Sequence, residues 1–254
     1  MIYLTFAEGD SPIHRLDPRL RVIVVAVFSI LIATTHSLTV ALCGLLLGAL
    51  LAALAELPNR GLLTRLLVVN GFVLFLWIFL PFSHAGEEAL FRMGRLEATR
   101  EGVMYATLIT LKCNAIALAV SALLSTIEVT ALGHALYHLW VPEKLIHLYM
   151  FTIRYFHVIR HEYERLATAA KVRGFRPRVN RHTYRTYGYL VGMLLVNSLD
   201  RAERVLAAMK CRGFLGRFYL LKHFEIRRAD VLFGTSALIV LAVLAWLQWT
   251  PAIP

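Results

Sequence analysis

The residues best suited to chemistry in this sequence are two arginines, Arg173 and Arg212, which stand near the ends of two copies of one string. The copies, residues 164–175 and 203–214, share seven of twelve positions, including the ending Lys-x-Arg-Gly-Phe. An arginine carries a planar fork of donors that suits a carboxylate on another protein, and lysine lacks this fork. The repeat therefore predicts two equivalent docking sites for two equivalent soluble partners.

A plainer explanation applies to each copy by itself. Gly174 and Gly213 stand just past the last turn of a predicted helix, where a left-handed backbone is easiest for a residue without a Cβ. Basic residues in the last turn suit the helix dipole, and a phenylalanine after the glycine supplies the apolar contact of such a cap. Capping alone does not need charged residues to recur in register, so we expect both capping and docking.

Eight residues form the predicted docking sites, and we expect no catalytic residue. They are Lys171, Val172, Arg173, Gly174, Lys210, Cys211, Arg212 and Gly213. The sequence contains no Gly-rich phosphate loop, nucleophile elbow or carboxylate–histidine cluster, so it predicts a chain that neither hydrolyses ATP nor catalyses a reaction alone. Two histidine pairs with i,i+4 spacing lack a third ligand, so we expect no metal site and no cofactor. These pairs are His134 with His138 and His157 with His161.

The composition is that of a membrane protein. Hydrophobic residues make up 58% of the 254 residues and charged residues 17%, and the mean hydropathy is +0.63. Soluble domains average about 45–50% apolar and about 25% charged residues. The apolar residues come in blocks separated by charged stretches, a pattern typical of several membrane-crossing helices. We therefore predict an all-α integral membrane protein with about five transmembrane helices.

The apolar blocks place these spans. The first block, residues 20–55, would be about 54 Å long as one helix, against a hydrocarbon core of about 30 Å, so it predicts two helices that turn at residues 34–37. The other spans are predicted at 66–82, ended by Pro81, at 103–127 and at 231–249.

The net charge of +11 comes from one segment of the chain. Residues 128–228 hold 18 Lys or Arg and 7 Asp or Glu, whereas the remainder is balanced. Because cytoplasmic loops are enriched in Lys and Arg, we place this segment on the cytoplasmic side of the cell (inner) membrane, with the N-terminus inside and the C-terminus outside. The charge suits membrane lipids with anionic headgroups or an acidic protein, and the position argues against nucleic acid.

Three regions follow from these patterns. Residues 1–127 form an N-terminal membrane region with four transmembrane helices, 128–228 a basic cytoplasmic helical region, and 229–254 the last transmembrane helix with a short tail. Apolar residues at helical intervals and a break at residues 176–178 divide the middle region into helices over 143–173 and 183–212. Its residues 184–199 are apolar enough to lie along the membrane interface, and a sixth crossing there stays open.

The sequence resembles a known family. The paired x-Arg-Gly motifs at the ends of cytoplasmic helices, Leu16-Asp17-Pro18-Arg19 before the first span and the five-block hydropathy are similar to the transmembrane T component (EcfT) of energy-coupling factor (ECF) ABC transporters, most of all to the cobalt-transport subunit CbiQ. The resemblance covers nearly the whole chain. The motif in that family is usually Ala-Arg-Gly, so Val172 and Cys211 depart from it while both Arg-Gly pairs match.

This resemblance implies a coupling subunit of an importer, with cobalt ion as the cargo. Each motif helix would dock in a groove of one of two CbiO-like ABC ATPase subunits, with Arg173 and Arg212 facing acidic residues. Closure of the ATPases would then move a CbiM-like substrate-binding membrane subunit, which would bind the cargo. Nickel or a vitamin as cargo and the stoichiometry of the complex stay open. The rival classes are a membrane-embedded lipid-processing enzyme and a permease half that carries substrate itself.

Overall fold

The computed structural model describes most of the chain and divides it into two units. The described residues are 11–14, 16–83, 89–93, 96–139, 141–214 and 228–249. Parts of the loop 84–100 and the tail after Trp249, both expected outside the membrane, lie outside the described residues. By its contacts, unit 1 comprises residues 1–139 and 224–254, and unit 2 comprises residues 140–223. The functional division at residues 127 and 228 stays a prediction.

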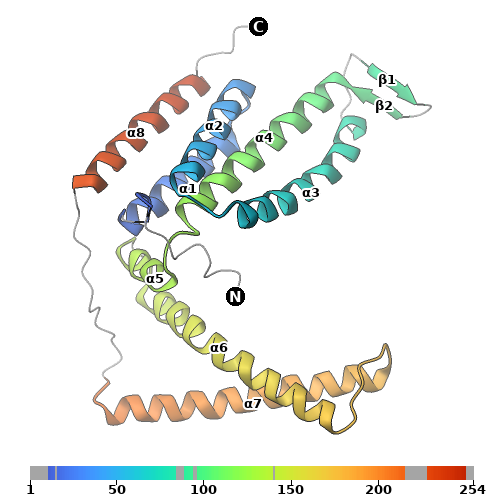
Figure 1. The fold of residues 1–254 in the computed structure, drawn as a ribbon, viewed down its shortest axis with the longest axis vertical. Coiled ribbons are helices and arrows are strands. Elements are labelled where there is room, and N and C mark those ends of the chain that lie inside the picture. Colours follow the sequence, from blue (N-terminus) through green and yellow to red (C-terminus); the bar gives the residue numbers. More distant parts are fainter. Residues whose placement is uncertain are drawn as a thin grey trace. The chain divides into compact units, whose positions relative to one another are not determined.

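Unit 1 is a bundle of helices (Figure 1). Its helices are α1 (Pro18–Thr34), α2 (Leu38–Leu54), α3 (Asn59–Ser83), α4 (Arg100–Leu123), α5 (Val129–His138) and α8 (Arg228–Trp249). Between α3 and α4 the chain forms an antiparallel hairpin of β1 (Ala89–Met93) and β2 (Leu96–Thr99), which the sequence analysis did not anticipate. The all-α membrane fold is otherwise confirmed.

Helices occupy each of the five predicted spans. Among the described residues, three helices are long and apolar enough to cross a membrane, namely α3 over Gly61–Pro81, α4 and α8, while α2 is a shorter apolar helix. The first apolar block is divided into α1 and α2 as expected. Pro81 does not end α3, which continues to Ser83. Proline lacks only its own N–H, and continuing the helix satisfies the backbone groups of the neighbouring residues in an apolar environment.

Small residues let α2 and α4 approach closely. Gly44 and Gly48 are four residues apart on α2, and both are buried. A Cβ added to Gly48 would lie 2.9 Å from the carbonyl oxygen of Ala115 on α4, so only glycine fits there. A Cβ at Gly44 would instead clash with the Ile32 side chain of α1, so the two glycines bring α2 close to two different helices. The core of the bundle therefore lies along α4.

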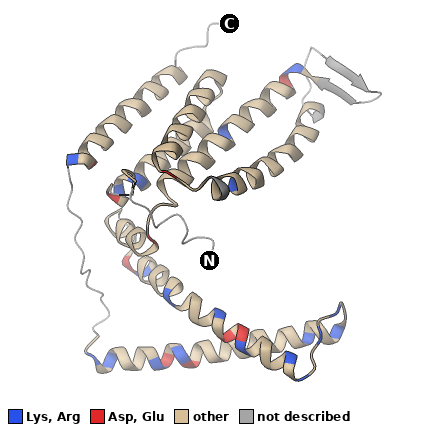
Figure 2. Ribbon diagram, in the orientation of Figure 1, with Lys and Arg blue, Asp and Glu red and all other residues tan. Residues whose placement is uncertain are grey.

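Unit 2 consists of α6 (Glu143–Val172) and α7 (Arg181–Cys211), which cross each other (Figure 1). Of its described residues, only Ile146, Glu162 and Thr183 are buried. Charged residues recur along α6 and α7, whereas α2 carries none, as Figure 2 shows. Helix α7 is not among the helices that qualify as spans within the described part of the chain. Unit 2 thus has amphipathic helices but almost no core of its own.

Candidate functional site

The two repeated motifs end α6 and α7 with the same backbone geometry. The glycines adopt left-handed φ values of +82° at Gly174 and +79° at Gly213. Each following phenylalanine donates its backbone N–H to the carbonyl five residues earlier, Phe175 to Ala170 and Phe214 to Met209, both at 3.1 Å. Each glycine N–H also bonds the carbonyl three residues earlier at 3.0 Å. This pair of bonds is the Schellman cap, so the predicted capping is confirmed for both copies.

The predicted docking residues stand on the surface of these caps. The basic residues of both motifs are exposed, namely Lys171, Arg173, Lys210 and Arg212. Val172 and Cys211 are exposed as well. Neither arginine forms an ion pair with any residue that the structure describes. The cap bonds join backbone groups only, so the guanidinium groups take no part in them. An exposed guanidinium on a fixed helix end suits a bidentate bond to a carboxylate.

The first motif continues into an ordered elbow, residues 173–183, that leads to α7. Asn180 caps α7, since its side-chain oxygen accepts the Thr183 N–H at 2.9 Å and the Thr183 hydroxyl at 2.7 Å. The Phe175 ring lies edge-on to Tyr187 with centroids 5.7 Å apart and 6.3 Å from the ring of His182. The C-terminal end of α6 and the first turns of α7 are therefore held together.

The second motif borders an apolar groove instead. Phe214 is half-buried and lines a groove of about 430 Å³ between α6 and α7. Tyr155 and Ile159 of α6 and Val205 and Met209 of α7 lie along the same groove. The two motifs thus share a cap but use their phenylalanines differently.

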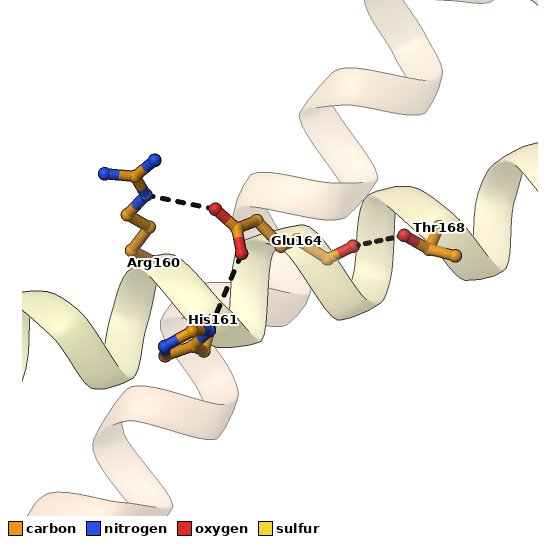
Figure 3. A network of polar contacts seen from close by, with 4 residues as sticks. All are labelled: Arg160, His161, Glu164 and Thr168. Carbon is orange, nitrogen blue, oxygen red and sulfur yellow. Dashed lines mark hydrogen bonds and ion pairs between the residues drawn. The ribbon is translucent and has the colours of Figure 1, made fainter.

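The opening glutamate of the first motif is bonded within its own helix. Glu164 accepts a bond from Arg160 Nε at 3.0 Å, and His161 Nδ1 lies 3.5 Å from its other carboxylate oxygen, as Figure 3 shows. Its backbone carbonyl accepts from the Thr168 hydroxyl at 2.8 Å. All three partners are on α6, so this exposed network stabilises the helix and does not tie it to α7.

Sequence reasoning missed the buried charges of unit 1. Asp17 caps α1 by accepting the Arg19 N–H at 2.8 Å, and its own N–H donates to Asp230 of α8 at 2.7 Å. Arg21 is 3% exposed and donates to the Thr126 hydroxyl at 3.0 Å. Local sequence carried no signal for these contacts, because the partners lie more than 100 residues apart.

Two polar residues inside α4 contact neighbouring helices. Asn114 exchanges two hydrogen bonds with Asn70 of α3, at 2.9 and 3.0 Å. Lys112 reaches the carbonyl of Ala33 at 3.0 Å. Across the described residues no three His, Cys, Asp or Glu side chains gather into a metal-binding group. The polar side chains of this span therefore join helices to one another.

Comparisons with known proteins identify relatives of this chain. Residues 9–220 match the family CbiQ, cobalt transport protein. A relative from Acidaminococcus fermentans, named energy-coupling factor transporter transmembrane protein EcfT, is 28% identical over 96% of this chain and 95% of its own length. Proteins with the same name from Heliobacterium modesticaldum and Listeria innocua are 29% and 25% identical, over 82% and 98% of this chain and 81% and 98% of their own lengths.

The match spans both units and includes both arginine-bearing caps. It also includes the Asp17-Pro18 start of α1 and four of the five helices in the predicted spans. The similarity is therefore not confined to the apolar segments, which many unrelated membrane proteins share. The chain belongs to the CbiQ family of transport proteins.

Proposed function

We propose that this chain is the transmembrane coupling subunit of an ECF-type ABC importer for cobalt ions. The observation that carries the proposal is the repeated cap, which presents an exposed arginine at the end of each of two crossing helices. Two identical presentations suit two similar ATPase subunits, one for each motif. The curated relatives carry the name of the transmembrane component of ECF transporters, which supports the same role here.

The docking residues would be the eight residues of the two helix ends. Arg173 and Arg212 would each bond an acidic group in the groove of one ATPase, with Lys171 and Lys210 adding positive charge. A charge-assisted hydrogen bond contributes about 1.5–3 kcal/mol. Gly174 and Gly213 would fix the direction of the arginines, while Val172 and Cys211 would contact the groove wall. Those residues are Lys171, Val172, Arg173, Gly174, Lys210, Cys211, Arg212 and Gly213.

The remaining chemistry would belong to the partners. Two CbiO-like ATPase subunits would bind and hydrolyse ATP, and a CbiM-like membrane subunit would bind the cargo. Unit 1 would sit in the cell (inner) membrane, and unit 2 would face the cytoplasm, with its apolar α7 surface against membrane lipids or the substrate-binding subunit. Motion of the ATPases would reach the cargo subunit through α6 and α7.

Docking is tested by capturing ABC ATPase subunits with the full chain in detergent. Arg173→Glu and Arg212→Glu should each weaken capture about tenfold or more, because a repulsive contact replaces a charge-assisted bond. The double variant should come near abolishing capture. Arg154→Glu, an exposed cation on α6 outside both motifs, is the matched control and should bind normally. Undiminished capture by the double variant would contradict the docking role and leave the arginines as capping residues.

The cargo is tested separately by uptake. Cells that express the whole transporter should accumulate radioactive cobalt, and the double arginine variant should not. Cobalt rests on the description of the matching family. Preferential uptake of nickel or of a vitamin would change the cargo and keep the coupling role.

A further inference from the structure

We propose that Glu162 and Asn197 form a pivot that sets the angle between α6 and α7, and thereby the distance between the two motifs. The purpose of such a pivot rests on the proposed function. The pivot itself is a property of this chain alone, so it is measurable without any partner. Glu162 is then a positioning residue for the two arginines, which it does not touch.

The carboxylate of Glu162 joins the two helices at their crossing. Its Oε1 atom accepts the Asn197 Nδ2–H of α7 at 2.9 Å and the Arg165 Nη2–H of α6 at 2.6 Å. Glu162 is 9% exposed, whereas the Arg165 side chain is 74% exposed. A buried carboxylate is costly unless it is hydrogen-bonded and neutralised. The arginine supplies the neutralising charge from the surface, and the asparagine supplies the bond across the crossing.

Little else in unit 2 fixes this angle. Glu162 is one of only three buried residues among the described part of the unit. On one side of the crossing an apolar groove of about 430 Å³ lies between α6 and α7. The elbow at residues 173–183 joins one end of each helix. Without the contact between Glu162 and Asn197, α7 would be tied to α6 through the elbow and a few apolar contacts.

The arms beyond the pivot are long enough to amplify small rotations. Arg173 follows Glu162 by eleven residues and Arg212 follows Asn197 by fifteen. At the helical rise these arms are about 16 Å and about 22 Å long, so a rotation of about 10° at the crossing displaces the end of the longer arm by about 4 Å. A shift of that size is larger than a hydrogen bond tolerates. Two arginines that must engage two partners at once therefore need a defined angle.

Glu164 provides a control from the same turn of the helix. It is also a carboxylate bonded to an arginine, but Arg160 and His161, its side-chain partners, lie on α6 itself (Figure 3). Its side chain is 50% exposed. Glu164→Gln removes one negative charge from α6 and leaves the contact between Glu162 and Asn197 unchanged.

The pivot is tested by the distance between spin labels on the two motifs, in the full chain in lipid nanodiscs. One label is carried by the native Cys211, which is exposed, and the other by Val172→Cys, with Cys43 and Cys113 replaced by serine. The native pair should give one narrow distance distribution. Asn197→Asp sets two carboxylates against each other and should broaden the distribution and shift its mean by several ångströms. Glu164→Gln should leave it unchanged.

An exchange of chemical groups separates a pivot from simple destabilisation. In the double variant Glu162→Gln/Asn197→Asp, the amide stands on α6 and the carboxylate on α7, so the bond across the crossing reforms with donor and acceptor reversed. The narrow distribution should return. If Asn197→Asp fails to fold, Asn197→Leu removes the donor without adding charge and should broaden the distribution as well. An unchanged distance in these single variants, or no recovery in the exchange variant, would overturn the proposal.

Binding of a linked pair of ATPases gives the functional readout. Two linked sites gain affinity only when both are engaged together, and this gain is lost when the geometry forbids it. Asn197→Asp should therefore weaken binding of an ATPase dimer about tenfold, and the exchange variant should restore it. A native chain that binds no ATPase would refute the proposed function while leaving the distance measurements intact. Normal dimer binding by a variant with a displaced label distance would show that the angle does not matter for docking.

Discussion

The two units of this chain place their polar residues in opposite ways. In unit 1 the charged residues Asp17, Arg21 and Asp230 are buried, in a bundle with an apolar core. In unit 2 most charges are exposed and a single carboxylate, Glu162, is buried. Burying polar groups in pairs makes a structure rigid and costly to alter, whereas exposed charges remain available to partners. The bundle is therefore stabilised by many buried contacts of its own, whereas the crossing helices have few buried residues and keep most of their charges exposed to partners.

The largest expected effect is on the bundle. Arg21→Leu removes the cation that lies near Asp17 and Asp230 and leaves two buried carboxylates without it. Removing a buried cation near buried carboxylates should be strongly destabilising, on the scale of about 3–5 kcal/mol that the loss of one partner of a buried pair costs. Thermal unfolding in detergent, followed by circular dichroism, should show a strongly lowered midpoint. Arg154→Ala on the exposed face of α6 is the comparison and should leave the midpoint unchanged. Equal midpoints for the two variants would remove the distinction between the units.

Close packing of α2 on α4 gives the next effect. Gly48→Leu would force the backbones apart, since even a Cβ would lie 2.9 Å from the Ala115 oxygen. Overpacking of this kind costs about 1–3 kcal/mol. Gly71→Leu is the matched control, because nothing lies within 4 Å of a Cβ at that position on α3. The unfolding midpoint should fall for the first variant only. A similar fall for both would mean that side-chain size in the spans, and not the α2–α4 contact, sets stability.

The sequence predicted those parts of the fold that have local causes. Helix α6 begins at residue 143 as expected, and Gly174 and Gly213 end α6 and α7 as expected. Each of these signals acts within one helical turn, so the residue type alone carries the information. The motifs were visible for the same reason, with the added strength of occurring twice.

The parts that sequence reasoning missed depend on distant partners or on weaker signals. The contacts between Asp17 and Asp230 and between Glu162 and Asn197 join residues 213 and 35 positions apart, and no spacing rule links them. The close approach of α2 to α4 at Gly48 was not predicted, because that glycine stands within a long apolar run. The hairpin of β1 and β2 was read as a plain loop because its strands are short.

A smaller effect separates the motif caps from the bundle. Gly174→Ala meets no steric neighbour within 4 Å, so its cost is that of the left-handed backbone, about 1–2 kcal/mol. The variant should fray the end of α6, displace Arg173 and weaken ATPase capture by up to about tenfold, while the unfolding midpoint of the bundle stays constant. Gly188→Ala, inside α7 and also without a neighbour, should not weaken capture. Unimpaired capture by Gly174→Ala would show that the cap does not position the arginine.

The smallest effect comes from the amide pair between α3 and α4. Asn70→Ala removes both hydrogen bonds between Asn70 and Asn114, so Asn114 keeps only its bond to the Thr110 carbonyl of its own helix. Hydrogen bonds between membrane helices contribute about 0.6 kcal/mol on average, with a maximum of about 1.7. The double variant Asn70→Leu/Asn114→Leu removes both amides, so it should unfold at a higher temperature than the single variant. Because the amide pair lies within unit 1, neither variant should alter ATPase capture. The prediction is wrong if either bundle variant changes ATPase capture as strongly as a motif variant does. Such a result would mean that the amide pair in unit 1 also affects the docking helices of unit 2, so that the two units do not act separately.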